Sequence, residues 1–250
     1  MIDSVDLMTK AERLRRQLGE DNNSPVDIFA LAQLLDELTL VFRPMGNNLS
    51  GMCIKDHYGN CTIAINSLMT VGRQRFSLAH EFYHMFYDEN MVSVCAKQID
   101  SGRALERKAD VFASFFLIPC AALLDKVEQL TKNSERKLSL TDIIWIEQFF
   151  GASHQATLFQ LLNCGCIGKN EVEEYINVSV SRRAATMGFN IDLYKPTEES
   201  KRYFTYGRYL NLVDQLNEKD LVSSGRYEEL LLDAFRADLV YGAEEGEIID

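Results

Sequence analysis

One pentapeptide constrains this chain more than any other feature: His80-Glu81-Phe82-Tyr83-His84. The chain has only four histidines, so two of them four residues apart form an informative pattern. On an α-helix, positions i and i+4 project from one face, one turn apart, so both imidazoles can reach one metal ion. The pattern predicts a helix on which His80 and His84 bind Zn²⁺. Glu81 is placed to accept a proton from the attacking water and is predicted to be the catalytic base.

A third ligand is expected downstream, because a catalytic zinc site takes three protein ligands and leaves its fourth position open. Glu106 follows His84 by 22 residues, which is enough chain to reverse and lay a second helix beside the first. Asp110 lies one turn further and is predicted to accept a hydrogen bond from a ligating histidine, which fixes the tautomer of that histidine. A glutamate and an aspartate four residues apart on a helix usually lie on a solvent-exposed face. The roles predicted for Glu106 and Asp110 therefore depend on the HExxH motif.

The remaining patterns predict an α+β chain, with a mainly helical domain that carries a small antiparallel sheet. Apolar spacing indicates the helices, and alternating apolar residues between turns indicate the strands. The helices are expected over 6–18, 26–38, 71–87, 103–118 and 121–130. The strands are expected over 39–43, 51–55 and 61–66, and the last two are expected to form a hairpin. The strand at 62–66 is expected to form the edge of the substrate cleft. An oxyanion donor is also required, and four candidates stay open: Tyr58, Tyr83, Tyr87 and His154.

Two separated segments, SLAHEFYHMFYD and ERKADVFASFFLIP, resemble the ImmA/IrrE family of bacterial zinc metallopeptidases. The resemblance covers roughly the first 130 residues and implies a gluzincin-like site, with His80, His84 and Glu106 as zinc ligands and Glu81 as general base. It also implies a protein substrate, a helix-turn-helix repressor of a mobile element, prophage or stress regulon. The family usually has a small residue where Tyr83 stands. A bulky side chain there is expected to crowd the neighbouring strand or narrow the cleft.

The second half of the chain predicts further helices. Two of them, 141–150 and 154–163, are joined by Gly151 and indicate a helix-turn-helix-like unit. We expect a metallopeptidase domain at 1–132, a helical, helix-turn-helix-like and acidic region at 133–241, and a flexible tail at 242–250. The helix at 154–163 contains no Lys or Arg, so direct DNA binding is not expected. Two alternatives stay open, a non-catalytic zinc-containing antitoxin or regulatory binding protein and a DNA-binding transcriptional regulator.

Charge and cysteine content bound the class of protein. The net charge is −11, and residues 171–250 contribute −8 of it through 17 acidic and 9 basic side chains. This acidic third is expected to dock a basic partner. The sequence shows no export signal, no apolar run of membrane-spanning length and no CxxC pair. A cytoplasmic protein with free thiols and no membrane contact is therefore expected, and its oligomeric state stays open.

Overall fold

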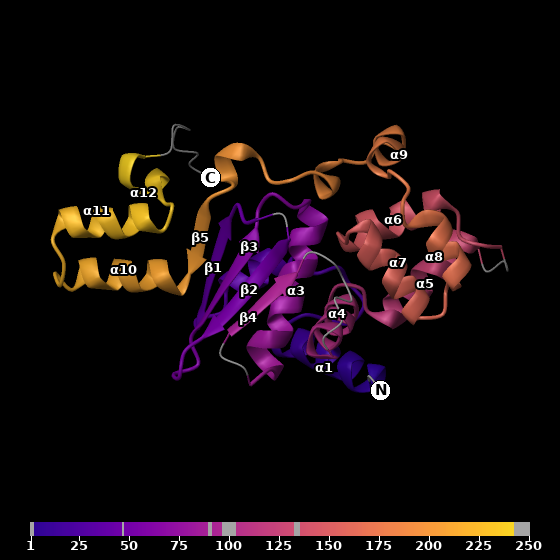
Figure 1. The fold of residues 1–250 in the computed structure, drawn as a ribbon, viewed down its shortest axis with the longest axis horizontal. Coiled ribbons are helices and arrows are strands. Elements are labelled where there is room, and N and C mark those ends of the chain that lie inside the picture. Colours follow the sequence, from indigo (N-terminus) through magenta and orange to yellow (C-terminus); the bar gives the residue numbers. More distant parts are fainter. Residues whose placement is uncertain (1–2, 47, 90–91, 97–103, 133–135, 243–250) are drawn as a thin grey trace.

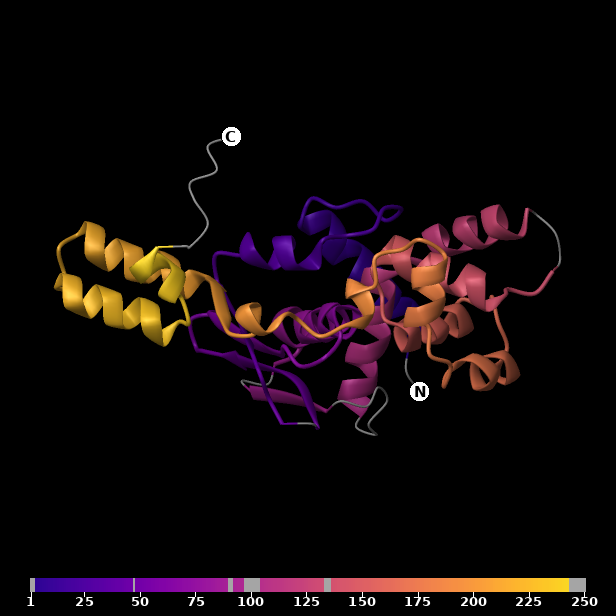
Figure 2. The ribbon, with the colours of Figure 1, turned by 90° about the horizontal axis from the view of Figure 1, so that it is seen from above.

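The computed structural model describes residues 3–46, 48–89, 92–96, 104–132 and 136–242. A twisted sheet and the helices packed against it form the middle of the molecule (Figure 1). Helices α5–α9 lie at one end, and a hairpin of α10 and α11 projects at the other (Figure 2). The segment between α9 and β5 runs back along the molecule and returns the chain to the sheet. The α+β class is therefore confirmed.

The sheet has five strands within the described ranges, in the order β4-β2-β3-β1-β5; they are β1 Leu38–Arg43, β2 Leu49–Lys55, β3 Cys61–Asn66, β4 Val92–Ala96 and β5 Phe204–Gly207. The expected hairpin of β2 and β3 is present, with Cys53 opposite Ile63. The sheet is mixed, not antiparallel as expected, because β1 and β3 run parallel. The chain reverses before β2 and again after it, so β3 regains the direction of β1.

The position of β3 corrects the expectation about the cleft. Residues 62–66 lie in β3, between β2 and β1, so both edges of this strand are already paired. The strand next to β2 is β4, which begins five residues after the end of the motif helix. Sequence patterns missed β4 and β5. A substrate chain that adds to this end of the sheet would meet β4 rather than 62–66.

The helices of the first half agree closely with the sequence patterns; they are α1 Ser4–Gln17, α2 Ile28–Gln33, α3 Val71–Tyr87, α4 Ala104–Leu117 and α5 Cys120–Thr131. The predicted 26–38 helix is shorter, because Asp27 caps its first turn and the chain enters β1 at Leu38. Helix α3 lies between the sheet and α4. Its Ala79 and Phe82 are fully buried, and the Phe82 ring packs on Phe116 of α4 at 5.8 Å.

Seven helices follow in the described part of the second half; they are α6 Leu140–Phe150, α7 His154–Asn163, α8 Lys169–Tyr175, α9 Ser181–Thr186, α10 Arg208–Glu218, α11 Ser224–Asp233 and α12 Ala237–Tyr241, with 3₁₀ turns η1 Asp192–Tyr194 and η2 Glu199–Lys201. Gly151, in the left-handed region at φ 62°, makes the turn between α6 and α7 as expected. Phe235, which has φ 61°, lies between α11 and α12 and separates the two helices.

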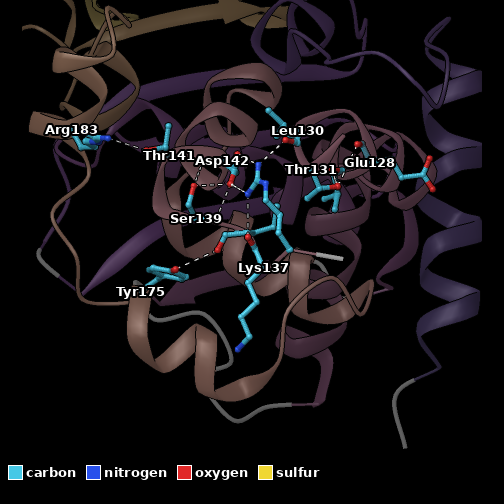
Figure 3. Close-up of polar contacts among 12 residues, drawn as sticks. Glu128, Leu130, Thr131, Lys137, Ser139, Thr141, Asp142, Tyr175 and Arg183 are labelled. Atoms are coloured by element: carbon cyan, nitrogen blue, oxygen red, sulfur yellow. Dashed lines mark hydrogen bonds and ion pairs between the residues drawn. The ribbon is translucent and has the colours of Figure 1, made fainter. Parts of the chain in front are cut away.

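A polar cluster fixes the start of α6 (Figure 3). Arg136 donates two hydrogen bonds to the carboxylate of Asp142, at 2.7 and 3.0 Å. The same carboxylate accepts from the backbone N–H of Ser139, while the Ser139 hydroxyl accepts from the Asp142 backbone. These bonds satisfy amides that the first turn of a helix leaves without intrahelical partners. The Arg136 side chain holds the pKa of Asp142 well below its usual range, at about 2.

The cysteines differ in part from expectation. Cys120 and Cys164 form a disulfide that joins the start of α5 to the end of α7, so the expectation of free thiols is wrong for these two. Cys53, Cys61 and Cys166 are free. Among the described residues, no helix combines the length and the apolar character that crossing a membrane requires. The division into three regions stays a prediction, and the expected tail lies outside the described residues except for Gly242.

Candidate metal centre

The three predicted ligands come from two packed helices. His80 and His84 lie one turn apart on α3, and Glu106 lies in the first turn of α4. All three are buried, with exposures of 6%, 1% and 8%. Their ligand atoms all lie within 4.8 Å of one another. The chain reversal expected between His84 and Glu106 therefore takes place, and it brings the carboxylate to the face that carries both imidazoles.

The spacing of these atoms fits a tetrahedral metal ion. His80 Nε2 lies 3.3 Å from His84 Nε2 and 3.3 Å from Glu106 Oε2, and His84 Nε2 lies 3.8 Å from Glu106 Oε1. Zinc ligands at bond lengths of about 2.0–2.1 Å in a tetrahedron are about 3.3 Å apart. Two imidazole nitrogens and one carboxylate oxygen thus occupy positions at which one divalent ion can bind all three. The donor set suits zinc and also other first-row transition metals.

Each histidine uses its outer nitrogen for a carboxylate. His80 Nδ1 lies 2.9 Å from Asp110 Oδ1, the contact that the sequence pattern predicts. His84 Nδ1 lies 2.8 Å from Asp88 Oδ2, a contact that sequence reasoning missed. Asp88 follows the last residue of α3, in extended backbone, so helical spacing does not indicate this contact. Both carboxylates direct Nε2 of their histidine toward Glu106 and raise the basicity of the ring.

The electrostatics at His84 favour a neutral ring. Burial lowers the pKa of His84, and the neighbouring His80 lowers it further, while Asp88 and Glu106 act in the opposite direction. The balance leaves the pKa below its ordinary value. A neutral imidazole is the form that binds a metal.

Strand β2 forms the wall beside Glu81, which is fully buried. A Cβ atom on Gly51 would lie only 2.7 Å from Glu81 Oε1, so the carboxylate rests directly against the strand backbone. Four residues after Gly51 in the same strand, Lys55 donates through Nζ to the backbone carbonyl of His84, at 2.9 Å, and to that of Asp88. These bonds tie the end of α3 to β2 and fix the helix relative to the sheet.

Tyr83 is buried between helices. It is 4% exposed, and its ring packs on Phe112 of α4 at 5.6 Å and on Tyr87 at 6.0 Å. Tyr83 therefore fills the interface between α3 and α4, and the expected narrowing of the cleft stays a prediction. The large residue is accommodated because the helices bury it between them.

The four candidate oxyanion donors have hydrogen bonds or positions that do not involve the three predicted metal ligands. Tyr87 donates its hydroxyl to the carbonyl of Lys10 in α1, and Tyr83 belongs to the helix interface. His154 contacts Glu147 Oε1 at 2.5 Å, in the α6–α7 unit. Tyr58 is 90% exposed at the turn between β2 and β3. The structure therefore brings together the predicted metal and base residues but assigns the oxyanion to none of the four candidates.

Comparison with known proteins agrees with this geometry. Residues 35–162, just over half of the chain, match the Peptidase M78 family model, described as the IrrE N-terminal-like domain. The matched span contains the motif helix and α4. The chain is also 35% identical over 104 residues to the radiation response metalloprotease IrrE of Deinococcus deserti. That similarity covers 40% of this chain and 35% of the relative, so the chain spans about a third of that protein. The chain belongs to the Peptidase M78 family of IrrE N-terminal-like domains.

Proposed function

We propose that this protein is a zinc-dependent endopeptidase. The observation that carries the proposal is the convergence of His80 Nε2, His84 Nε2 and the Glu106 carboxylate. The two nitrogens lie 3.3 Å apart, His80 Nε2 lies 3.3 Å from Glu106 Oε2, and His84 Nε2 lies 3.8 Å from Glu106 Oε1. The donor types and the spacing fit a catalytic zinc with one open position. Membership in a metallopeptidase family supports hydrolysis of peptide bonds. Asp110 and Asp88 are the proposed outer carboxylates that orient the two imidazoles.

The chain's own residues then have distinct tasks. His80, His84 and Glu106 would hold the zinc, which when bound supplies Lewis acidity that polarises a carbonyl and acidifies water. Glu81 takes the proton from the attacking water and delivers it to the amine that leaves the cleaved bond. Gly51 lets the Glu81 carboxylate lie against β2 without steric conflict. Burial of Glu81 keeps bulk water from competing for this proton transfer.

The proposed substrate is a helix-turn-helix repressor of a mobile element, prophage or stress regulon. Resemblance to the ImmA/IrrE family supports this choice, and the net charge of −11 suits attraction of a basic DNA-binding protein. Because such a substrate is met at DNA, the proposal places the enzyme in the cytoplasm. A DNA-reading role for α7 itself is less consistent with its surroundings. Gln160 is fully buried and donates to the carbonyl of Ile118, so it is not available to base edges.

The test compares Glu81→Gln with Glu128→Gln, which changes an exposed glutamate of α5 in the same way. Purified proteins are loaded with Zn²⁺, their metal content is measured, and cleavage of a purified helix-turn-helix repressor encoded beside the gene is followed by mass spectrometry. We expect both variants to retain about one zinc per chain. Only Glu81→Gln should lose cleavage, by roughly 10²-fold or more.

The outcomes separate the alternatives. Undiminished cleavage by Glu81→Gln contradicts the proposed base. Zinc binding by the wild-type protein with no cleavage of any repressor or peptide supports the non-catalytic binding protein instead. A shift of DNA mobility at physiological salt that survives Glu81→Gln supports the transcriptional regulator.

A further inference from the structure

A cavity of about 350 Å³ lies where β5 returns the chain to the sheet, between α2, β1, η2 and the first turn of α3. Its volume falls within the range typical of small-molecule sites. None of the residues assigned to the metal centre is among those that line it. The cavity nevertheless touches the motif helix, because Gln74 of its wall precedes His80 by six residues, or about 9 Å along the axis.

Aromatic side chains dominate the wall of this cavity; they are Phe29, Phe42, Phe204 and Tyr206. Phe204 lies opposite Phe42 in the pairing of β5 with β1, and Tyr206 lies two residues further along β5, so these three project from one face of the sheet. The Phe42 ring is nearly perpendicular to the Phe29 ring, at 5.3 Å, and to the Tyr206 ring, at 6.1 Å. Phe29, Phe204 and Tyr206 are only half-buried. The cavity therefore offers aromatic surface that a ligand can bury.

The charges around these rings disfavour a cationic ligand. The Arg75 guanidinium lies 5.9 Å from the centre of the Phe29 ring, and the Arg236 guanidinium lies 4.4 Å from the centre of the Phe204 ring. Each of these two rings therefore already has a cation from the protein beside it. The protein has 37 acidic residues, yet the described residues that line the cavity include Lys201 and neither Asp nor Glu.

Two hydrogen-bond donors of the lining have capacity left for a ligand. Lys201 ends η2, and its ammonium group forms no ion pair with any residue that the structure describes. The Tyr206 hydroxyl has no hydrogen-bond partner within the described part of the chain, and burial raises the pKa of Tyr206, so the hydroxyl keeps its proton. By contrast, Gln74 and Thr197 bond to each other, at 2.9 and 3.1 Å. A charged and a neutral donor beside aromatic rings suit a ligand that joins a ring to a carboxylate.

We propose that this cavity binds a small aromatic carboxylate, whose flat ring system packs on Phe29, Phe42 and Tyr206 and whose carboxylate binds Lys201. A volume of about 350 Å³ holds one or two fused rings and excludes a helix or a protein domain. Such a ligand would contact α2, β5 and the motif helix together. The proposal goes beyond the proposed peptidase function, and its test requires no peptidase activity.

The test uses three probes of similar size on the full, zinc-loaded chain: 2-naphthoate, its saturated analogue decahydro-2-naphthoate, and the neutral 2-naphthalenemethanol. Binding is followed by two-dimensional amide NMR titration. A ligand of about 13 non-hydrogen atoms is expected to bind with a Kd on the order of 0.1–1 mM. We expect 2-naphthoate to saturate and to shift the amides of Gln33, Val71 and Tyr206. Decahydro-2-naphthoate should bind about tenfold more weakly, because it cannot make ring contacts. It carries the same carboxylate, so any binding of that group to zinc is common to both anions.

Variants identify the cation that is responsible. Lys201 is exposed, so Lys201→Gln should weaken binding of 2-naphthoate about two- to fivefold and leave that of 2-naphthalenemethanol unchanged. The matched control is Lys219→Gln, which removes an exposed ammonium group after α10, outside the cavity lining. This control should bind both probes as the wild type does.

Several results would overturn the proposal. One is that 2-naphthoate leaves the three amides of the wild-type protein unshifted. Another is that decahydro-2-naphthoate or 2-naphthalenemethanol binds as tightly as 2-naphthoate, because the first would remove the rings from the site and the second the carboxylate. The third is that Lys201→Gln binds 2-naphthoate as the wild type does, or that Lys219→Gln weakens binding as much as Lys201→Gln.

Discussion

Gly51→Ala probes the contact between strand β2 and the proposed base. The added Cβ would lie 2.7 Å from Glu81 Oε1, whereas an ordinary carbon–oxygen contact is about 3.4 Å, so the two atoms overlap by about 0.7 Å. The same Cβ would lie 3.2 Å from the backbone oxygen of Ala64 in β3, so β2 has little room to withdraw. The Glu81 carboxylate must therefore move. A displacement approaching 1 Å at a proton-transfer group can reduce the rate about 10²-fold.

The expected result is a selective loss of catalysis. Gly51→Ala should lower kcat/KM by about 10- to 100-fold and should cost about 1–3 kcal/mol of folding stability through overpacking. Zinc content should not change, because the strand contacts Glu81 rather than a ligand. The matched control is Gly46→Ala, where an added Cβ meets nothing within 4 Å. Zinc content, thermal unfolding and cleavage of the same repressor are measured for both variants. Wild-type cleavage by a folded Gly51→Ala protein would refute the reasoning.

Three further predictions concern other parts of the molecule. Asp110→Asn and Asp88→Asn should each weaken zinc binding about 10- to 100-fold, as measured by competition with a chelating indicator; unchanged affinity would remove these carboxylates from the site. Asp142 has a pKa of about 2 in the folded protein, below its usual 3.8, so the stability that it contributes is complete above about pH 4 and is lost as the pH falls toward 2. Because the Arg136 side chain that pairs with Asp142 is 43% exposed, we expect the pair to contribute only about 1 kcal/mol to the free energy of unfolding. Asp142→Asn should therefore make the free energy of unfolding, measured with denaturant, depend less on pH between about 4 and 2. A profile that stays as steep would contradict this. Charge reversal at Glu228 and Glu229 on α11 should slow association with a basic partner in low salt, as followed by surface plasmon resonance; an unchanged rate assigns these charges to solubility alone.

The candidate metal site could be predicted because local rules govern it. His80, Glu81 and His84 occupy one helix, whose apolar spacing sets its length, and Glu106 lies on a second helix at a separation that allows a reversal. Asp88 was missed because it follows the last residue of α3, in extended backbone, where helical spacing is no longer a guide. Its contact with His84 depends on how the helix ends.

The sheet was harder to predict because its pairing is not local. Strand β5 joins β1 from more than 160 residues away, with Val41 opposite Thr205, and its four residues give little alternating pattern. The hairpin of β2 and β3 could be predicted from its turn. The parallel pairing of β3 with β1, which makes the sheet mixed, could not, because it depends on tertiary packing. The contact of Gly51 with Glu81 likewise arises only when the sheet and α3 are packed together.

X-ray absorption at the zinc edge tests the central claim most directly. The measurement is made on protein reconstituted with Zn²⁺ and, in parallel, on His80→Ala. We expect about one zinc per wild-type chain, with nitrogen and oxygen ligands at about 2.0–2.1 Å, no sulfur ligand, and loss of this signal in the variant. A sulfur shell at about 2.3 Å would assign the metal to the cysteines. That result, or an unchanged spectrum in His80→Ala, would contradict the account.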